Sequence, residues 1–372
     1  MFRWQLRISR PARGLPGTES PLALADATAP VLQALQRTLA EARAEGQALR
    51  IVGGNTRADW WATAATRPLA MSSFRGIITH EPSELVVTAR AGTPLLELED
   101  ALAERGQCLG FEPPRLSEAS TLGGAISSGW SGPARPYLGS ARDHVLGVRL
   151  LGADGTVLRF GGEVMKNVAG YDVSRLVSGA WGRFGPLLDI SLRVYPRAEQ
   201  TLALRWACDE AEAWRQMVVL GRRFTPVSGC RYVSGQLHVR LAGSATAVDA
   251  AVRDLPGGAS EEAAETWTRW RDFADPWFTG SGPLWRVIVP AATAPLKVGG
   301  HAAWDWGGAL RWYRDVTDAE ELARLALAAG GHARPWRVAA STRLSDDAVG
   351  HLSRRLVQGF VPGGCFNPEA SP

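Results

Sequence analysis

Residues 161–172 read Gly-Gly-Glu-Val-Met-Lys-Asn-Val-Ala-Gly-Tyr-Asp, a stretch with glycines at both ends that follows a predicted hairpin. Two further loops of this kind precede it, Gly53-Gly54-Asn55-Thr56 and Thr121-Leu122-Gly123-Gly124-Ala125. Glycine lets a backbone approach a ligand closely, and successive backbone amides in such loops form concave sites for phosphate oxygens. We therefore interpret the three segments as loops that converge on one large ligand.

The bulk composition is typical of a globular protein with two cores. A chain of 372 residues is long enough for two domains, with hydrophobic and charged contents of 45% and 21%. The net charge of +4 comes mostly from scattered arginines, which indicates a solvated surface and no nucleic-acid footprint. The N-terminal residues lack the apolar region of a signal peptide, and no apolar stretch is long enough to span a bilayer. We expect a cytoplasmic chain that meets a membrane only through a partner.

The four cysteines, Cys108, Cys208, Cys230 and Cys365, lie far apart and form no Cys-x-x-Cys pair. This spacing argues against an iron–sulfur or zinc site within the chain, so no metal is predicted. Isolated thiols also fit a reducing compartment.

The pattern along the chain predicts a poorly ordered segment at 1–22, a first domain at 23–197 and a second domain at 198–372. In the second half, strands mix with helices without a regular βαβ repeat, which predicts an α+β fold. Helices are expected at 29–44, after Pro94 with Thr93 as N-cap, at 172–177 with Asp172 as N-cap, and at 210–222, 245–255, 317–329 and 346–357. Strands are expected at 48–52, 84–90, 145–151, 156–160, 188–196, 202–207, 236–241, 285–289 and 310–313.

The first glycine loop, 53–57, follows a buried strand as a phosphate loop should. It is not Gly-x-Gly-x-x-Gly and no Walker lysine follows it, which argues against Rossmann or P-loop nucleotide binding. A tight turn at the strand exit is the alternative interpretation of the Gly-Gly pair. For Thr121–Gly129, the alternative is a helix of small residues that packs closely on a sheet.

The order of these loops and the sequence around them resemble flavoenzymes of the vanillyl-alcohol-oxidase type, also called the PCMH fold. Within that group, nearly the whole chain resembles the smaller FAD-binding subunit of bacterial glycolate oxidase (glycolate dehydrogenase). The resemblance implies a PCMH-type FAD-binding domain with two subdomains, followed by an α+β C-terminal domain of the FAD-linked-oxidase kind. It also implies that the tail around Asn367 returns toward the flavin.

The resemblance, together with the loops, places FAD contacts on three glycine loops, the 182–187 segment and the tail. Family members that tether FAD covalently often carry histidine in the first loop; Asn55 stands there instead, so non-covalent FAD is expected. The assigned residues are Gly53, Gly54, Asn55, Thr56, Arg57, Pro113, Ser120, Thr121, Gly123, Gly124, Ser127, Gly129, Lys166, Asn167, Gly182, Leu187 and Asn367.

The segment 179–187 departs from the broader flavoenzyme pattern, Gly-Ser-Glu-Gly-Thr-Leu-Gly. Trp181 and Arg183 replace Glu and Thr, and Pro186 intrudes. Backbone contacts from Gly182 and Leu187 to FAD are compatible with these changes, whereas a side-chain role carried by Glu is not. This loop motivates one alternative, a scaffold subunit that has lost its flavin.

The catalytic relatives carry a His-x-Gly-Asp-Gly-Asn-x-His segment, and no two of the six histidines here have that spacing. The catalytic residues are therefore unknown, with Lys166 and His332 as the nearest candidates. The resemblance implies a larger catalytic flavoprotein subunit that oxidises a small 2-hydroxy acid, glycolate to glyoxylate, and an iron–sulfur subunit. The present chain would hold FAD and support assembly or electron relay. The other alternative is a self-sufficient FAD-dependent 2-hydroxy-acid dehydrogenase.

The segment 304–312, Trp-Asp-Trp-Gly-Gly-Ala-Leu-Arg-Trp, resembles the small subunit's own signature. We interpret it as a strand pair packed on the flavin domain, or as a docking surface for the partner.

Overall fold

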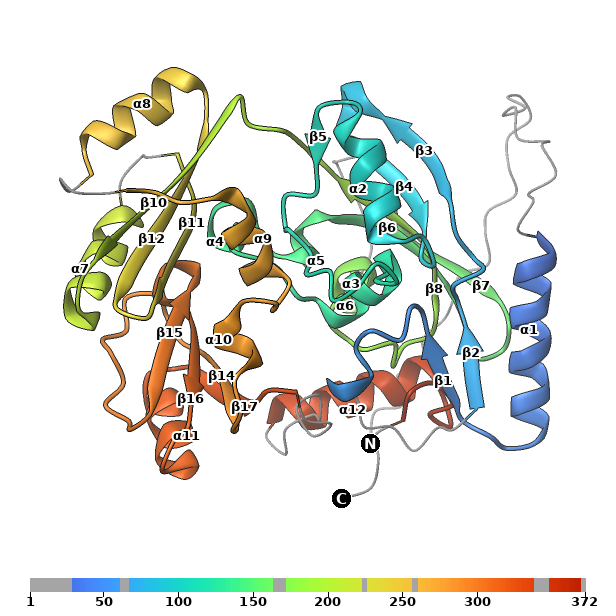
Figure 1. Ribbon diagram of the computed structural model, residues 1–372. Helices are drawn as coiled ribbons and strands as arrows, with labels where there is room; N and C mark the ends of the chain where they lie inside the picture. Colours follow the sequence, from blue (N-terminus) through green and yellow to red (C-terminus); the bar gives the residue numbers. More distant parts are fainter. Residues whose placement is uncertain are drawn as a thin grey trace.

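The computed structural model describes residues 29–60, 67–162, 172–222, 226–255, 260–337 and 348–368. The chain forms two lobes, each built on its own antiparallel sheet, and the C-terminal segment crosses back to the first lobe (Figure 1). Within the described ranges, no helix is both long and apolar enough to cross a membrane. The mixture of helix and sheet confirms the predicted α+β class.

The first lobe is centred on a five-stranded antiparallel sheet of order β3-β4-β8-β6-β7. Its middle strand, β8, is buried along all but its last residue, because neighbouring strands and helices cover it. The strands are β3 (Ile77–Glu81), β4 (Val86–Arg90), β6 (Val145–Leu151), β7 (Val157–Gly161) and β8 (Leu187–Arg193). The predicted strand at 188–196 divides, because its last two residues form β9 (Tyr195–Pro196), which pairs with β5 (Gln107–Cys108).

Short helices pack on this sheet and enclose the core of the lobe. Pro94, not Thr93, occupies the N-cap position of α2, so the Thr93 prediction was wrong. The Thr93 hydroxyl accepts a hydrogen bond from the Gly76 amide at 2.9 Å instead. The predicted cap at Asp172 is confirmed, since its side chain accepts from the Arg175 amide. The helices are α2 (Leu95–Ala103), α3 (Leu122–Ser128), α4 (Arg135–Leu138), α5 (Ala141–His144) and α6 (Val173–Leu176), with the 3-10 turn η2 (Pro82–Glu84).

A smaller subdomain combines the start and the end of the described chain. Helix α1 (Ala29–Ala44) packs beside the parallel pair β1 (Leu49–Val52) and β2 (Arg67–Ala70). After α12 (Ala348–Phe360), the tail adds a parallel bridge from Phe366 to Leu49. The loop after β1, which contains the 3-10 turn η1 (Ala58–Trp60), is therefore held next to the C-terminal tail.

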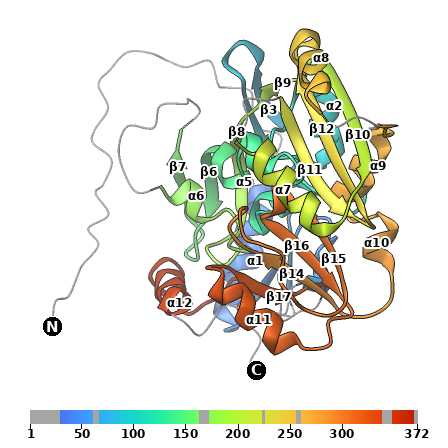
Figure 2. The same cartoon turned by 90° about the vertical axis from the view of Figure 1, so that its left-hand side faces the viewer.

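The second lobe is an eight-stranded antiparallel sheet of order β13-β10-β12-β11-β15-β16-β14-β17. Its helices divide between two faces: α7, α8 and α11 lie on the outer side, and α9 and α10 lie between the lobes (Figures 1 and 2). The strands are β10 (Gln200–Ala207), β11 (Val227–Val233), β12 (Gln236–Gly243), β13 (Ser260–Glu261), β14 (Leu284–Ile288), β15 (His301–Asp305), β16 (Leu310–Arg314) and β17 (His332–Pro335). The helices are α7 (Glu210–Leu220), α8 (Ala245–Arg253), α9 (Ala264–Arg271), α10 (Pro276–Thr279) and α11 (Ala319–Ala328).

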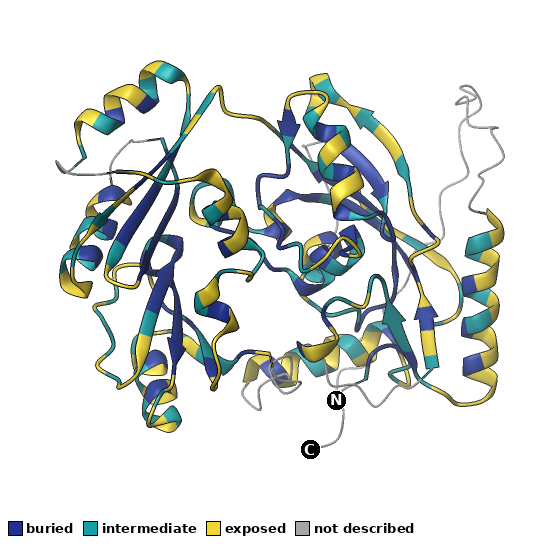
Figure 3. Cartoon of the chain, viewed as in Figure 1, coloured by how far each residue is buried: buried dark blue, intermediate teal, exposed yellow. Residues whose placement is uncertain are grey.

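Tryptophans join the two lobes. One apolar cluster contains Trp60 and Trp130 from the first lobe together with Trp270, Trp312 and Trp336 from the second. The strands beneath it are buried, whereas the outer helices expose one face (Figure 3). This cluster fixes the lobes against each other through large apolar contacts.

The segment 304–312 forms the end of β15, the turn η3 (Trp306–Gly308) and the start of β16. The Trp306 indole is 3% exposed and donates its Nε1–H to the Gly132 carbonyl at 2.9 Å. The segment is thus a strand pair packed on the first lobe, and its buried indoles are not available as a docking surface.

Candidate cofactor cleft and a neighbouring cavity

A cleft of about 880 Å³, including its open mouth, lies between the loop after β1, helix α3 and the segment 179–187. Two of the three predicted glycine loops, 53–56 and 121–125, therefore meet at one place together with the segment 179–187, whereas most of the third, 161–172, lies outside the described residues. The sequence-predicted residues that line it are Gly53, Gly54, Asn55, Thr56, Arg57, Thr121, Gly123, Gly124, Ser127, Gly182, Leu187 and Asn367.

The loop after β1 requires its glycines for close packing. A Cβ on Gly54 would overlap the Ala119 carbonyl oxygen, and one on Gly53 would lie 2.5 Å from the Thr121 Oγ1. The backbone amides of residues 53–56 donate no hydrogen bond to any residue that the structure describes. Four consecutive unused amides on a cleft wall suit the oxygens of a phosphate group.

Arg57 supplies a positive charge beside these amides. Its side chain is 8% exposed, and its Nη2 donates to the Pro114 carbonyl at 3.1 Å. The guanidinium lies 5.3 Å from the Trp130 ring centroid, and within the described chain it has no carboxylate partner. Burial lowers its pKa to about 10, so it stays charged at neutral pH. A buried cation without a counterion favours an anion in the cleft.

Helix α3 forms the second wall. Thr121 is its N-cap, with its hydroxyl oxygen accepting from the Gly124 amide at 3.2 Å. A Cβ on Gly123 would lie 2.8 Å from the Ala91 Cβ, whereas one on Gly124 would face Thr121 and Arg57 at 3.2 and 3.4 Å. Both interpretations of this motif therefore hold: Gly123 allows close packing on the sheet, and both glycines line the cleft.

The segment 179–187 is held against the C-terminal end of α3. The Gly179 amide donates to the Ile126 carbonyl at 2.9 Å, and the Trp181 amide donates to the Ser127 carbonyl at 2.8 Å. Trp181 has φ of 54°, a conformation uncommon for a bulky residue. The segment therefore reaches the cleft although its side chains differ from the family pattern.

Asn367 connects two walls of the cleft. Its Oδ1 accepts from the Ile51 amide at 2.9 Å, and its Nδ2 donates to the Trp181 carbonyl at 2.7 Å. Its own amide donates to the Leu49 carbonyl at 2.9 Å. Asn367 thus positions the segment 179–187 relative to β1, which gives the predicted return of the tail a structural basis.

The remaining predicted residues lie elsewhere. Ser120 is behind the cleft, with its hydroxyl 3.4 Å from the Thr56 Oγ1, and Pro113 precedes the carbonyl that binds Arg57. Gly129 and His332 line a different cavity, and Lys166 and Asn167 fall outside the described residues. Cleft residues that sequence reasoning missed carry no glycine signal and precede, follow or face the loops: Arg50, Ile51, Val52, Ala58, Met71, Ala91, Ser128 and Trp181.

The second cavity, which we call the arginine cavity, lies between the lobes and measures about 1200 Å³ with its open mouth. Ser128 and Trp181 line both it and the cofactor cleft. Its cationic side chains are Arg135, Arg142, Arg183, Arg286 and Arg334.

His332 is the histidine on the wall of the arginine cavity. His332 is exposed at the start of β17, yet desolvation by the cavity wall and the neighbouring Arg334 and Arg286 lower its pKa, so its ring is neutral at neutral pH. A neutral imidazole beside the cofactor cleft can accept a proton.

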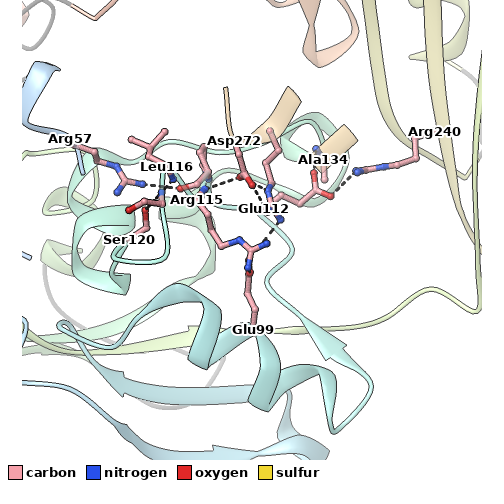
Figure 4. A network of polar contacts seen from close by, with 12 residues as sticks. Arg57, Glu99, Glu112, Arg115, Leu116, Ser120, Ala134, Arg240 and Asp272 are labelled. Atoms are coloured by element: carbon pink, nitrogen blue, oxygen red, sulfur yellow. Dashed lines mark hydrogen bonds and ion pairs between the residues drawn. The ribbon is translucent and has the colours of Figure 1, made fainter. Parts of the chain in front are cut away.

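A polar network connects the cofactor cleft to the second lobe (Figure 4). It begins at Arg57 and the Pro114 carbonyl, and continues through the Arg115 amide, which donates to the Asp272 carboxylate at 2.8 Å. Glu112 closes it by pairing with Arg240 at 2.7 Å. Residues that position the cleft cation are therefore fastened to helix α9 and strand β12.

The glycine cradle, its unused amides and the buried Arg57 fit the pyrophosphate of a dinucleotide and define a cofactor-binding protein. The sequence pattern of the family described as "FAD binding domain" matches residues 27–161, so the cofactor is FAD, as predicted. The matched segment contains the first two glycine loops and four of the five strands of the first sheet, β3, β4, β6 and β7.

Relatives extend the identification over the whole chain. The chain is 40% identical to "Glycolate oxidase subunit GlcE" of Escherichia coli (strain K12) over 345 residues, 90% of this chain and 96% of the relative. It therefore belongs to the GlcE family. It is 31% identical to "Glycolate oxidase subunit GlcD" of Bacillus subtilis (strain 168) over 40% of this chain and 32% of that one. A solved structure of "alkyldihydroxyacetonephosphate synthase" shares the fold, with a TM-score of 0.65 at 14% identity, covering 91% of this chain and 76% of that one.

Proposed function

We propose that this chain is the FAD-holding subunit of a glycolate oxidase complex that converts glycolate to glyoxylate. It works beside a larger catalytic flavoprotein subunit and an iron–sulfur subunit, without an inserted membrane segment of its own in the described chain. The observation that carries the proposal is the 40% identity to GlcE across 90% of the chain, combined with the cradle formed by the glycines of the first two loops.

FAD supplies the hydride acceptor when it is bound, and this chain's residues bind and orient it. The amides of residues 53–56 and the Arg57 guanidinium receive the pyrophosphate, while Thr121, Gly124, Ser127, Gly182, Leu187 and Asn367 shape the rest of the cleft. The described cleft lining contains no histidine or cysteine, which supports non-covalent binding.

Glycolate oxidation is assigned to the larger subunit because this chain offers few proton acceptors. Three of the described histidines bond elsewhere: His80 to Gln107, His144 to the Leu138 carbonyl and His238 to Glu262. Within the described residues, no cluster of His, Cys, Asp or Glu can hold a metal ion.

The position of His332 in the arginine cavity supports the second candidate, a self-sufficient 2-hydroxy-acid dehydrogenase. For both candidate functions, we propose that the chain has two domains, residues 23–197 and residues 198–372.

The first test is the visible spectrum of the purified chain and of its supernatant after denaturation. A flavin band that moves into the supernatant is expected; a colourless protein that stays colourless after incubation with FAD would contradict the cofactor role. The second test is glycolate-dependent dye reduction by the chain alone and with both partner subunits. Activity only with the partners is expected, and full turnover by the chain alone would establish the second candidate.

A further inference from the structure

Helix α12 leaves a row of apolar side chains in water. Val349, Leu352 and Leu356 are 69%, 56% and 37% exposed, and their spacing of three and four residues puts them on one face of the helix. The helix lies along the lower edge of the molecule, with exposed residues over most of its length (Figures 1 and 3). The other exposed large apolar side chains of the described chain each stand alone on a different element: Ile78 on β3, Leu96 on α2, Val157 on β7, Val219 on α7 and Leu327 on α11.

Gly359 continues this row, three residues after Leu356. Glycine weakens a helix relative to alanine, so its place within α12 requires a reason. The described chain supplies none, because a Cβ at residue 359 would meet nothing within 4 Å. Bare backbone at the end of an exposed apolar row allows another molecule to approach closely. We call this face, made of Val349, Leu352, Leu356 and Gly359, the α12 stripe.

The charged groups of α12 are all basic. The helix carries His351, Arg354 and Arg355 and no Asp or Glu. Arg355 is exposed, lies one turn before Gly359 at the edge of the stripe, and forms no ion pair with any residue that the structure describes. These charges favour a protein partner whose apolar patch is bordered by acidic side chains.

A membrane and a second copy of this chain fit the stripe less well. Lipid recognition typically uses clusters of about four to eight Lys or Arg, more than α12 carries. The stripe is also only about 15 Å long, at 1.5 Å per residue from Val349 to Gly359. Two copies that packed through α12 would bring their basic side chains together without an acid on either helix.

The opposite face of α12 is fixed to the first lobe. Val357 and Phe360 pack on the core of that lobe, and the ring centroids of Phe360 and Phe184 are 5.4 Å apart. Phe184 belongs to the segment 179–187, which lines the cofactor cleft. Because a helix with its side chains is about 10 Å wide, a protein on the stripe lies about one helix width from Phe184, close behind the wall of the cleft.

We propose that the α12 stripe is the surface on which the larger flavoprotein subunit docks, with acidic side chains of that subunit facing Arg355. The inference rests on the proposed function, in which this chain works as one subunit of an oxidase, as its 40% identity to GlcE supports. It goes beyond that function because it assigns the contact to one helix and places the partner beside the cofactor cleft.

The test is the affinity of the FAD-loaded chain for the purified larger subunit, measured by biolayer interferometry at several salt concentrations. Leu352→Gln and Leu356→Gln should each weaken binding about tenfold or more, since each replaces an apolar side chain that docking removes from water. Leu96→Gln is the matched control and should bind as the unmodified chain does, because Leu96 is also a helical leucine and is also 37% exposed. Arg355→Gln should weaken binding at low salt and reduce its dependence on salt.

Gly359→Gln separates docking from folding. Glutamine is a better helix former than glycine and extends here into open space, so the melting temperature should not fall. Binding to the larger subunit should still weaken about tenfold, because the new side chain occupies the space that the partner needs. The flavin content of every variant, read from its visible spectrum, should equal that of the unmodified chain.

Unchanged affinity in the Leu352, Leu356 and Gly359 variants would overturn the docking surface and leave the proposed function in place. Absence of binding by the unmodified chain would overturn both. A colourless chain that still binds the larger subunit through the stripe would contradict the cofactor role and support the docking surface.

Two further measurements test the choice of partner. Analytical ultracentrifugation of the chain alone should show a monomer, and a dimer that Leu352→Gln dissociates would assign the stripe to a second copy. Vesicles of phosphatidylethanolamine and phosphatidylglycerol should not sediment the chain, and sedimentation that Leu352→Gln abolishes would assign the stripe to a membrane. Either result would overturn the proposal.

Discussion

The cofactor cleft and the arginine cavity share two lining residues, but they are built in opposite ways. The cleft is made mainly of backbone, with glycines that let the loop after β1 touch the segment 119–124. The cavity is made of side chains, with guanidinium groups from both lobes stacked on the Trp306 indole. A backbone site depends on the absence of side chains in short segments, whereas a side-chain site depends on the packing of two lobes.

The largest expected effect comes from adding one methyl group to the cleft. Gly54→Ala places a Cβ onto the Ala119 carbonyl, so the loop must move away from the segment 119–124. We expect the variant to lose its bound flavin, because forcing the extra carbon into this packed contact costs about 3 kcal/mol or more. Flavin stoichiometry after gel filtration measures it. Gly359→Ala is the control, because nothing lies within 4 Å of that Cβ. Equal flavin content in both variants would contradict the claim that the loop after β1 needs glycine at residue 54.

The second prediction concerns Asp305, a buried carboxylate that holds Trp306 on the wall of the arginine cavity. It is 4% exposed, and its carboxylate accepts from the Trp270 Nε1 at 2.8 Å and the Trp306 amide at 2.7 Å. Burial raises the pKa of Asp305 to about 6 from 3.8, against the opposing effects of these two hydrogen bonds and of Arg231. The folded state therefore binds the proton more tightly than the unfolded state, and the contribution of this group to stability falls as pH rises between about 4 and 6.

Asp305→Asn removes this titration. The free energy of unfolding of the wild type, minus that of the variant, should decrease by on the order of 2–3 kcal/mol from pH 4 to pH 7, since one pKa unit corresponds to about 1.36 kcal/mol. Urea unfolding at several pH values measures the difference. A difference that does not vary with pH would show that the carboxylate titrates normally.

The two ways of building a site also explain what the sequence could predict. Gly53, Gly54, Gly123 and Gly124 lie in short motifs whose spacing predicts a phosphate-binding loop, and all four line the cleft. The stacked Arg135 and Arg286 carry no such signal, because their meeting at Trp306 depends on how the lobes pack. Asn367 was found through the family resemblance of the tail, but its two hydrogen bonds required the structure.

The fold follows the same rule. The strands and helices with regular apolar periodicity were predicted to within a few residues, whereas strands β2, β3, β11 and β17 and helix α9 are among the elements that were missed. Arg231 interrupts the apolar pattern of β11, yet its side chain is 1% exposed and pairs with Glu262 at 2.8 Å. It also lies 4.9 and 4.8 Å from the ring centroids of Trp267 and Trp270 on α9. A buried ion pair between distant segments thus obscures β11 in the sequence, whereas α9 buries only its two tryptophans, Trp267 and Trp270, against this arginine.

A smaller effect is expected from the connection between the tail and the segment 179–187. Asn367→Gly keeps the backbone conformation at φ of 41° but removes the hydrogen bonds to Ile51 and Trp181. We expect FAD to bind about tenfold more weakly, because two buried groups lose their partners. Fluorescence titration with FAD measures it, beside Gln358→Ala on the exposed side of α12. Unchanged FAD affinity would show that the segment 179–187 is held without the tail.

The smallest expected effect concerns the ion pair between Glu112 and Arg240, which joins the lobes at 2.7 Å with side chains 23% and 14% exposed. Glu112 also accepts a hydrogen bond from the Ala134 amide at 2.8 Å, and both groups are partly shielded from water. A double-mutant cycle with Glu112→Gln and Arg240→Met should give a coupling energy of about 1 kcal/mol that decreases with salt. The exposed pair of Glu321 and Arg324 should give about 0.5 kcal/mol or less. If the coupling at Glu112 is no larger than at Glu321, this ion pair does not stabilise the contact between the lobes, and the tryptophan cluster with the Trp306 and Arg115 hydrogen bonds holds them together.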